Sequence, residues 1–412
     1  MAVNRERFFR LSSRLSRREI LAGAGVLAAA AGAKAQKRSG GELLAYVGAI
    51  TDTLNGKGIY TFKVDLESGA LEPLESYVSG DRNPSWLAFH PAGTHLYAAN
   101  SVSTVNGHNG SVSAFAIDAS SGGLKLLNTV DAKGSGSTHC SVHPSGDWLF
   151  VANYGAGNAA VLPIRPDRTL GEATDVASIP VDPPALGKQP AADAPAGSYA
   201  ISGHDSAHAH QIGCDPAGNF VFLTDLATDR TLVFAFDSKA GKLTPNTPPA
   251  VKEAEGAGPR HFAFHPNGKY FYVINEEAST MTFMTYDAAK GVLTPRQTLP
   301  TLPPDFVGTT YTSEVVIAAD GRHVYGLNRL HDTIAIFRVG GDGRLTFLGE
   351  EWTRADYPRH AAIEPTGKFL YVCNDRGDSI TRFRIQGGGQ RLEFAGYTPV
   401  RIPSFIGFRR LP

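Results

Sequence analysis

Short apolar segments alternate with glycine-containing turns along most of the chain, and this alternation repeats. Six stretches share an apolar strand, a turn ending in glycine and a second apolar strand. They are WLAFHPAGTHLYAANS, HCSVHPSGDWLFVANY, QIGCDPAGNFVFLTDL, HFAFHPNGKYFYVINE, EVVIAADGRHVYGLNR and HAAIEPTGKFLYVCND. Their turn glycines, Gly93, Gly146, Gly218, Gly268, Gly321 and Gly367, are separated by 53, 72, 50, 53 and 46 residues. Because further strands follow each pair, the pattern predicts one four-stranded sheet per repeat.

The two ends of the chain supply a seventh unit. PSFIGF, residues 403–408, resembles the strand NPSWLAF, while ELLAYVGAI, GIYTFKVD and LESYVSG near the N-terminus supply three more strands. A blade built from both termini closes the ring and protects strand edges that would otherwise pair with other molecules. We therefore predict an all-β, seven-bladed β-propeller, closed by a blade shared between the N- and C-termini, in one domain of residues 36–412.

The first 35 residues differ from the rest of the chain. SRREIL follows an arginine-rich start, and an alanine-rich apolar run ends in AKA before Gln36. This order is typical of a twin-arginine signal peptide, residues 1–35, and predicts export to the periplasm. The run from Ile20 to Ala33 is too short and rich in Ala and Gly to span a bilayer stably, so we expect no membrane span. Residues 1–35 hold seven basic and two acidic residues, which leaves the remainder at about −5 and disfavours nucleic-acid binding.

The gap of 72 residues contains a Pro- and Ala-rich stretch without a strand pattern, residues 171–200. We expect a long loop there that covers one face of the ring. It ends just before SAHAHQIG, which holds His208 and His210.

Residues that break the repeat are the candidates for chemistry. The start of the first strand and the residue after the second strand lie at the same end of a blade, because the two strands form a hairpin. A structural side chain should recur there in every blade, as the Asn/Asp row Asn100, Asn153, Asp225, Asn275, Asn328 and Asn374 does. The exceptions at this shared end are His210, Arg260, Glu276, Glu314, Arg329 and Arg359.

Four of these stretches resemble the lactonase family of seven-bladed β-propellers, which includes bacterial 6-phosphogluconolactonases and, more distantly, fungal carboxy-muconate lactonizing enzymes. The stretches are AHAHQIGCDPAGNFVF, EGAGPRHFAFHPNGKYFYVINE, SEVVIAADGRHVYGLNR and YPRHAAIEPTGKFLYV, and GPRHFAFHPNGK followed by VINE is the most specific. The resemblance implies an active site of His208, His210, Arg260, Glu276 and Arg329. Two features depart from the family: Ala207 stands where Pro often precedes HAH, and an export signal is unexpected for an enzyme of cytosolic 6-phosphogluconolactone.

Hydrolysis of a lactone requires an activated water and a group that stabilises the oxyanion. We expect His210 or Glu276 to act as the base, and Arg260 to stabilise the oxyanion. Arg329, also catalytic, and Arg359 would bind a carboxylate or phosphate of the small-molecule substrate. The full set of expected substrate-binding residues is His208, His261, Glu314 and Arg359.

Three other interpretations remain open. The same site could catalyse a muconate-type lactonization, since an enzyme accelerates both directions of one equilibrium. A non-catalytic exported propeller could bind a polysaccharide or a protein, with Trp86, Tyr154 and Tyr311 at its mouth. His208 and His210 could bind a metal, but only Glu276, Glu314 and His261 could add ligands. We expect neither metal nor cofactor, and a monomer.

Overall fold

The computed structural model describes residues 41–51, 57–78, 82–105, 108–180, 191–201 and 203–411. Within these residues the chain forms seven four-stranded antiparallel sheets and no α-helix. The predicted signal peptide, residues 1–35, lies outside the described residues.

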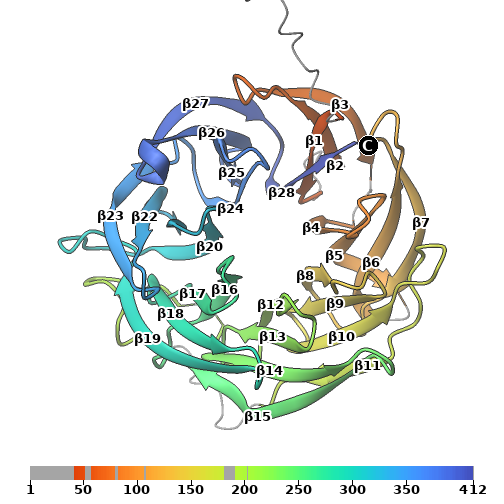
Figure 1. Cartoon of the computed structure of the whole chain (residues 1–412), viewed down its shortest axis with the longest axis horizontal. Coiled ribbons are helices and arrows are strands. Elements are labelled where there is room, and N and C mark those ends of the chain that lie inside the picture. The colour runs from red at the N-terminus through yellow and green to blue at the C-terminus, as the bar shows by residue number, and fades with distance from the viewer. Residues whose placement is uncertain are drawn as a thin grey trace, which may run out of the picture. The chain divides into compact units, whose positions relative to one another are not determined.

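The sheets follow one another around a ring (Figure 1). The first three, each ordered from its central strand outward, are β28(Pro403–Arg410)–β1(Leu43–Ala49)–β2(Gly58–Val64)–β3(Leu71–Val78), β4(Pro84–Phe89)–β5(His95–Val105)–β6(His108–Ile117)–β7(Leu124–Asp131) and β8(Ser137–Val142)–β9(Trp148–Asn153)–β10(Asn158–Pro163)–β11(Asp175–Ser178). The next two are β12(Ala209–Cys214)–β13(Phe220–Asp225)–β14(Arg230–Asp237)–β15(Lys242–Lys252) and β16(Pro259–Phe264)–β17(Tyr270–Asn275)–β18(Thr280–Asp287)–β19(Val292–Pro300). The last two are β20(Tyr311–Ile317)–β21(His323–Arg329)–β22(Thr333–Val339)–β23(Leu345–Trp352) and β24(Pro358–Ile363)–β25(Phe369–Asn374)–β26(Ser379–Gln386)–β27(Arg391–Pro399), with a 3₁₀ turn η1(Gly387–Gly389) between β26 and β27.

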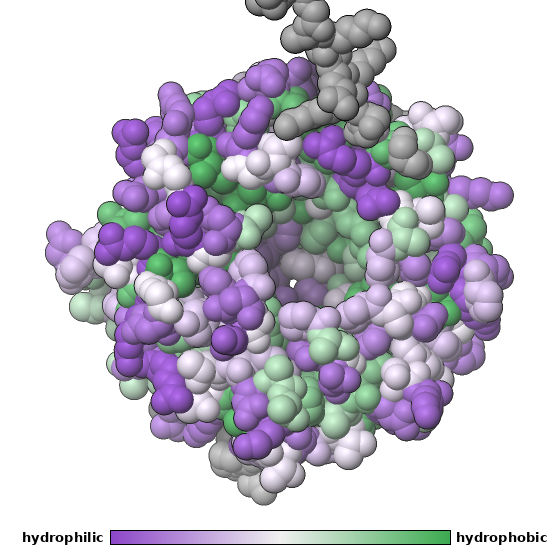
Figure 2. All heavy atoms as spheres, in the orientation of Figure 1, coloured by the Kyte–Doolittle hydropathy of each residue, from purple (hydrophilic) through white to green (hydrophobic). Residues whose placement is uncertain are grey.

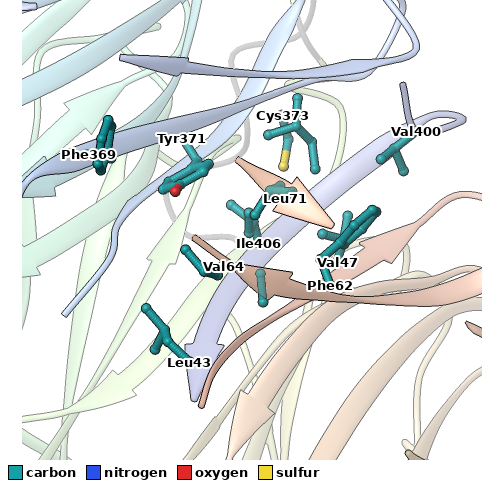
Figure 3. Packing of buried hydrophobic residues seen from close by; sticks show 12 residues of the cluster. Leu43, Val47, Phe62, Val64, Leu71, Phe369, Tyr371, Cys373, Val400 and Ile406 are labelled. Carbon is teal, nitrogen blue, oxygen red and sulfur yellow. The ribbon is translucent and has the colours of Figure 1, made fainter. Parts of the chain in front are cut away.

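The predicted shared blade is confirmed. Strand β28 from the C-terminus pairs antiparallel with β1 from the N-terminus, from Leu43↔Arg410 to Ala49↔Pro403. Apolar side chains of this blade pack against β25 and β26 of the preceding blade, where Phe62 and Ile406 lie in one buried cluster with Phe369 and Tyr371 (Figure 3). The ring is therefore closed by burial of apolar surface as well as by backbone hydrogen bonds.

The HPxG motif of three repeats joins each blade to the next. The Nε2 atom of His90 lies 3.1 Å from the carbonyl oxygen of Gly146, that of His143 lies 2.9 Å from Gly218 O, and that of His265 lies 2.8 Å from Gly321 O. A carbonyl can only accept, so each imidazole donates from Nε2 to the glycine turn of the following blade. These histidines are structural, and their recurrence follows from the recurrence of the blade.

The long loop expected at residues 171–200 is only partly a loop. Asp175–Ser178 form β11, the outer strand of a blade, which pairs with β10 through Asn158↔Ser178 to Val161↔Asp175. The prediction was wrong here because a half-exposed outer strand needs little apolar sequence: DVAS has no fully buried residue. Residues 181–190 lie outside the described residues.

After this gap, residues 191–201 lie against the ends of two other blades. Gly308 N donates to Ala196 O, Tyr199 N to Thr309 Oγ1 and Ile201 N to the Tyr311 hydroxyl, each at 2.9 Å. Thr309 and Tyr311 stand at the start of β20, so this segment covers part of the end of the ring where the candidate residues gather. Figure 2 shows that the face in view is hollowed at the centre of the ring, with the most hydrophilic side chains mainly around its periphery.

Candidate active site

Every central strand of the ring carries a β-bulge at the same end of the blade. In β16, for example, Pro259 pairs with Asn275 and His261 with Ile274, so Arg260 is an extra residue without a partner in the ladder. Equivalent shifts occur in β28, β4, β8, β12, β20 and β24. A bulge re-aims side chains, so that neighbours such as Arg260 and His261 both reach the centre of the ring, although strict alternation would send them to opposite faces.

Four of the bulged residues line a cavity of about 270 Å³ at the mouth of the ring: Thr138, His210, Arg260 and Arg359. Its volume suits a small ligand, although it lies just below the usual range of enclosed drug-sized pockets. The lining is mostly polar. It consists of Ser101, Gly136, Thr138, Tyr154, His210, Arg260, Glu276, Arg329 and Arg359.

Glu276 lies between two guanidinium groups in this cavity. Its Oε2 atom is 2.9 Å from Arg260 Nε and 2.7 Å from Arg329 Nη2, and all three side chains are nearly buried. Burial opposes the charge of Arg329, but Glu276, Tyr357 and Asp375 together outweigh burial and raise the pKa of Arg329. Burial, together with the nearby Arg329 charge, lowers the pKa of Arg260 to about 9, which still leaves it charged at neutral pH. Arg260 and Arg329 therefore place two cations beside the Glu276 carboxylate.

Backbone carbonyls and aromatic rings fix the orientation of Arg329. Its Nη2 donates to Thr312 O at 2.9 Å and its Nε to Tyr311 O at 3.2 Å. The guanidinium carbon lies 5.7 Å from the ring centre of Tyr311 and 5.0 Å from that of Tyr357. Such cation–π contacts favour the charged side chain in this one orientation.

Arg359 is the more accessible cation of the mouth. Its Nη1 atom contacts Asp375 Oδ2 at 3.3 Å, and 28% of its side chain is exposed, against 3% for Arg260. The contact with Asp375 is long for a charge-assisted hydrogen bond. Arg359 is therefore the arginine of the cavity best placed to exchange its partner for an anionic group of a ligand.

His210 is a neutral imidazole within the same cavity. Burial, followed by the charge of Arg260, lowers its pKa well below the usual value, so the ring carries one proton at neutral pH. Its Nδ1 atom is buried and has no hydrogen-bond partner among the described residues. A neutral ring with an unsatisfied nitrogen can accept a proton or position a water.

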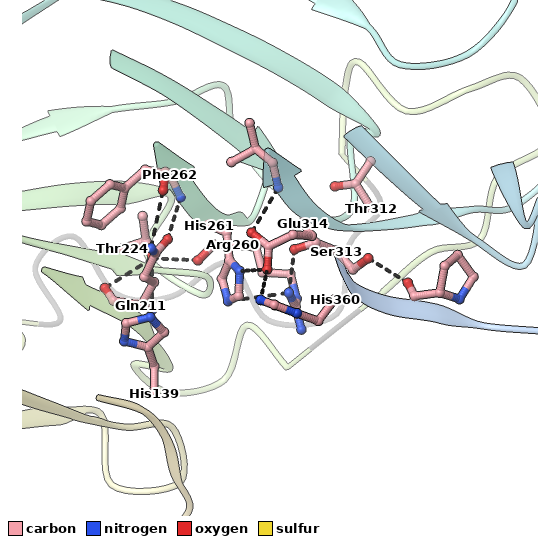
Figure 4. A network of polar contacts seen from close by, with 12 residues as sticks. His139, Gln211, Thr224, Arg260, His261, Phe262, Thr312, Ser313, Glu314 and His360 are labelled. Carbon is pink, nitrogen blue, oxygen red and sulfur yellow. Dashed lines mark hydrogen bonds and ion pairs between the residues drawn. The ribbon is translucent and has the colours of Figure 1, made fainter. Parts of the chain in front are cut away.

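The other three predicted substrate-binding residues do not line this cavity. His208 stacks on Tyr154 at 4.3 Å between ring centres, with its Nδ1 atom 3.0 Å from Tyr154 O, so it supports a residue of the cavity wall. His261 and Glu314 lie deeper, in a layer of buried and half-buried side chains at the centre of the ring (Figure 4). This layer takes one residue from each blade: Trp86, His139, Gln211, His261, Glu314, His360 and Phe405.

Sequence reasoning did not select Ser101, Gly136 and Thr138 as site residues. Thr138 occupies the bulge position in β8, the same register as His210 and Arg260, and this register is the signal that could have identified it. Gly136 directly precedes β8 and Ser101 lies within β5, and neither was selected. Across the described ranges, no cluster of three or more His, Cys, Asp or Glu side chains suited to a metal ion is found.

This geometry defines a seven-bladed β-propeller with an Arg–Glu–Arg and histidine cavity at its mouth. The chain belongs to the lactonase family of seven-bladed β-propellers, whose model matches residues 44–408. No described helix has the length and apolar character needed to cross a bilayer.

The names of similar proteins are consistent with this family. The 6-phosphogluconolactonase of Bacillus subtilis is 33% identical over 324 residues, which cover 78% of this chain and 85% of the relative. The 6-phosphogluconolactonase of Formosa agariphila is 31% identical over 332 residues, covering 78% and 86%. Among solved structures, the periplasmic gluconolactonase of Pseudomonas aeruginosa is similar with a TM-score of 0.80 and 26% identity, covering 90% of this chain and 100% of that one.

Proposed function

We propose that this protein is an exported lactonase that hydrolyses the ester of a sugar-acid lactone. The observation that carries the proposal is the Glu276 carboxylate held between Arg260 and Arg329 beside the neutral His210, in a cavity of about 270 Å³. Hydrolysis of a lactone needs a base that activates water and cations that stabilise the oxyanion. Both kinds of group line this cavity.

His210 is the base in this mechanism. The Glu276 carboxylate is engaged by two guanidinium groups, whereas the His210 ring is neutral and its Nδ1 has no partner among the described residues. His210 takes the proton of the attacking water, and Arg260 stabilises the negative charge that develops on the carbonyl oxygen. Glu276 orients Arg260 and Arg329. When the tetrahedral intermediate collapses, the bond between the carbonyl carbon and the ring oxygen breaks, and His210 returns its proton to that leaving oxygen, which gives the open hydroxy acid.

Arg359 binds the anionic group of a substrate that carries one. Its guanidinium is partly exposed and only loosely paired with Asp375, so a phosphate or carboxylate can compete for it. This role separates phosphorylated lactones, named in the curated relatives, from the plain gluconolactone named in the solved structure.

Export is the second part of the proposal. It rests on the twin-arginine pattern of residues 1–35 and on the likeness to a protein described as periplasmic. Expression of the full chain, followed by fractionation and N-terminal sequencing, tests it. The expected result is a periplasmic chain that begins at Gln36, and a cytoplasmic chain with its first residues intact would overturn this part.

The activity is tested by proton release from residues 36–412 against phosphorylated and plain aldonolactones. The matched control is Glu276→Gln, which keeps the shape of the side chain and removes its charge. We expect rates above the spontaneous hydrolysis for the unmodified chain and a loss of about 100-fold in the variant. Equal rates in the two proteins would contradict the proposed enzymatic function and favour a non-catalytic propeller that binds a polysaccharide or a protein. Formation of a lactone from a muconate-type diacid would favour the lactonizing reaction.

A further inference from the structure

The buried layer beneath the cavity contains a hydrogen-bonded pair whose role the proposed chemistry does not use. His261 Nδ1 lies 3.0 Å from Glu314 Oε2, and neither side chain lines the mouth cavity (Figure 4). The two side chains are exposed by only 2% and 7%. A buried carboxylate at this depth costs folding free energy unless it is fully hydrogen-bonded. In another blade the equivalent position is occupied by an apolar residue, Phe405.

The proton positions of this pair follow from its partners. The second nitrogen of His261, Nε2, lies 3.4 Å from Arg260 Nη1. A guanidinium only donates, so Nε2 must be the unprotonated nitrogen and the proton of the neutral ring sits on Nδ1, facing Glu314. Burial lowers the pKa of His261 well below its usual value, which agrees with a neutral ring.

Glu314 is held in turn by groups that only donate to it. Its Oε1 atom accepts from Val315 N at 3.0 Å. His360 faces the same oxygen as His261, with its Nε2 atom 3.6 Å away, and its Nδ1 accepts from Ile406 N at 3.2 Å. The proton of His360 is therefore on Nε2, directed at Glu314. These contacts fix the carboxyl group and, through it, the tautomer and orientation of His261.

Two residues of the mouth cavity contact this pair in the described part of the chain. Arg260 does so through the contact between its Nη1 and His261 Nε2, and His210 packs edge to face on the His261 ring, 4.9 Å between ring centres. The Arg260 guanidinium is held from three sides, by Glu276 at Nε, by Ser313 O at Nη1 and by His261 at the same Nη1. Ser313 directly precedes Glu314, so the same segment of β20 supplies one contact of Arg260 directly and the other through His261. Removing the acceptor on His261 would take away one of these three contacts and loosen the orientation of the guanidinium, which Glu276 and Ser313 O would still hold.

We propose that His261 and Glu314 are a positioning pair, which holds the Arg260 guanidinium in the orientation that faces the carbonyl of the substrate. The pair acts through Arg260 and does not touch the substrate. This inference rests on the proposed function for its catalytic consequence, although the hydrogen bonds themselves are independent of it.

Two substitutions of His261 separate this role from simple packing. In His261→Gln the amide oxygen reaches the place of Nε2 and can still accept from Arg260, whereas in His261→Asn the shorter amide reaches only the place of Nδ1. We expect His261→Gln to keep kcat within about threefold of the unmodified protein, and His261→Asn to lower kcat by about 100-fold with KM within about twofold, the cost of a displaced catalytic group. Glu314→Gln should fall between them. The matched control is His139→Asn. His139 belongs to the same layer and its Nδ1 accepts from Ile212 N at 3.4 Å, an acceptor that asparagine can replace, so this variant should keep the rate.

Equal kcat in His261→Gln and His261→Asn, or a loss that appears in KM, would overturn the proposal. A second measurement does not depend on activity. Nitrogen-15 NMR of labelled histidine should show His261 as the tautomer protonated at Nδ1, and the Arg260 Nε–H signal, assigned with Arg260→Lys, should shift in His261→Asn and persist in His261→Gln. A His261 ring protonated at Nε2 would overturn the pair. If the unmodified chain opens no lactone, the proposed function is wrong. The NMR result alone then tests whether His261 and Glu314 hold the Arg260 guanidinium.

Discussion

A buried ion pair beside the active site makes a pH-dependent contribution to stability that can be measured directly. His204 Nε2 lies 2.7 Å from Glu277 Oε2, and His204 Nδ1 lies 2.9 Å from Ala227 O, with both side chains fully buried. Both partners accept, so both ring nitrogens must donate and the ring is an imidazolium. Burial disfavours this charge, but the hydrogen bond to Glu277, the charge of Glu277, the Ala227 carbonyl and the charge of Asp229 together outweigh burial, and the pKa of His204 is raised from 6.5 to about 9.

The magnitude follows from the shift. A rise of the pKa from 6.5 to about 9 corresponds to about 3 kcal/mol of stabilisation. Because the pKa is raised in the folded state, this contribution is complete below pH 6.5 and is lost as the pH rises through 9. Glu277→Gln removes the charge that raises the pKa. The variant should therefore be less stable by about 3 kcal/mol at pH 6, with a difference that shrinks towards zero near pH 10.

Urea unfolding of both proteins at pH 6, 8 and 10 measures the difference, and groups that titrate equally in both cancel. Glu350→Gln is the control, because Glu350 also pairs with a histidine, His331 at 2.9 Å, but both side chains are partly exposed. A pair of this kind contributes at most about 1 kcal/mol. A Glu277→Gln destabilisation that is the same at all three pH values would show that His204 is not charged in the folded protein.

Three further results are expected. Arg260→Met should lower kcat for a lactone about 100-fold, with KM nearly unchanged, in steady-state assays, because it removes the cation that stabilises the oxyanion; an unchanged kcat would exclude it as oxyanion donor. Arg359→Gln should raise KM for a phosphorylated lactone about tenfold and leave KM for the plain lactone unchanged, and equal effects on both would argue against an anion contact. Deletion of residues 403–411 should prevent folding, as judged by circular dichroism and size exclusion, because it removes the central strand β28 and bares the edge of β1; a soluble monomer with the usual Tm would contradict the closure.

The fold could be predicted in detail because the repeat is local in sequence. Each blade contains its own strands and turn, and even the shared blade was visible because PSFIGF and NPSWLAF begin alike. Strand β11 was not predicted, because it is an outer strand that pairs with one neighbour, has only four residues and contains no buried side chain. Its pairing depends on the edge of β10, which sequence periodicity does not report.

The sequence predicted most residues of the candidate site, but it did not predict which of them line the cavity and which lie in the buried layer beneath it. His210, Arg260, Glu276, Arg329 and Arg359 all line one cavity, as their shared end of the blades suggested. The assignment of each residue to substrate or to support depends on the bulges, because one extra residue in the strand changes which side chains reach the mouth. An alternating pattern of apolar and polar residues carries no signal for that extra residue.

The bulges have a consequence for how such a ring can change its chemistry. A bulged residue has no ladder partner, so its side chain can be exchanged with little effect on the pairing of the sheet. Around the ring these positions hold Ser404, Ser85 and Thr138 on three successive blades, His210 and Arg260 on the next two, and Arg359 two blades further on. Thr138, His210, Arg260 and Arg359 line the mouth cavity, whereas Ser404 and Ser85 are buried and do not line it. Substitutions at the four lining positions are therefore a direct way to change which ligand the mouth accepts, with the frame of the propeller intact.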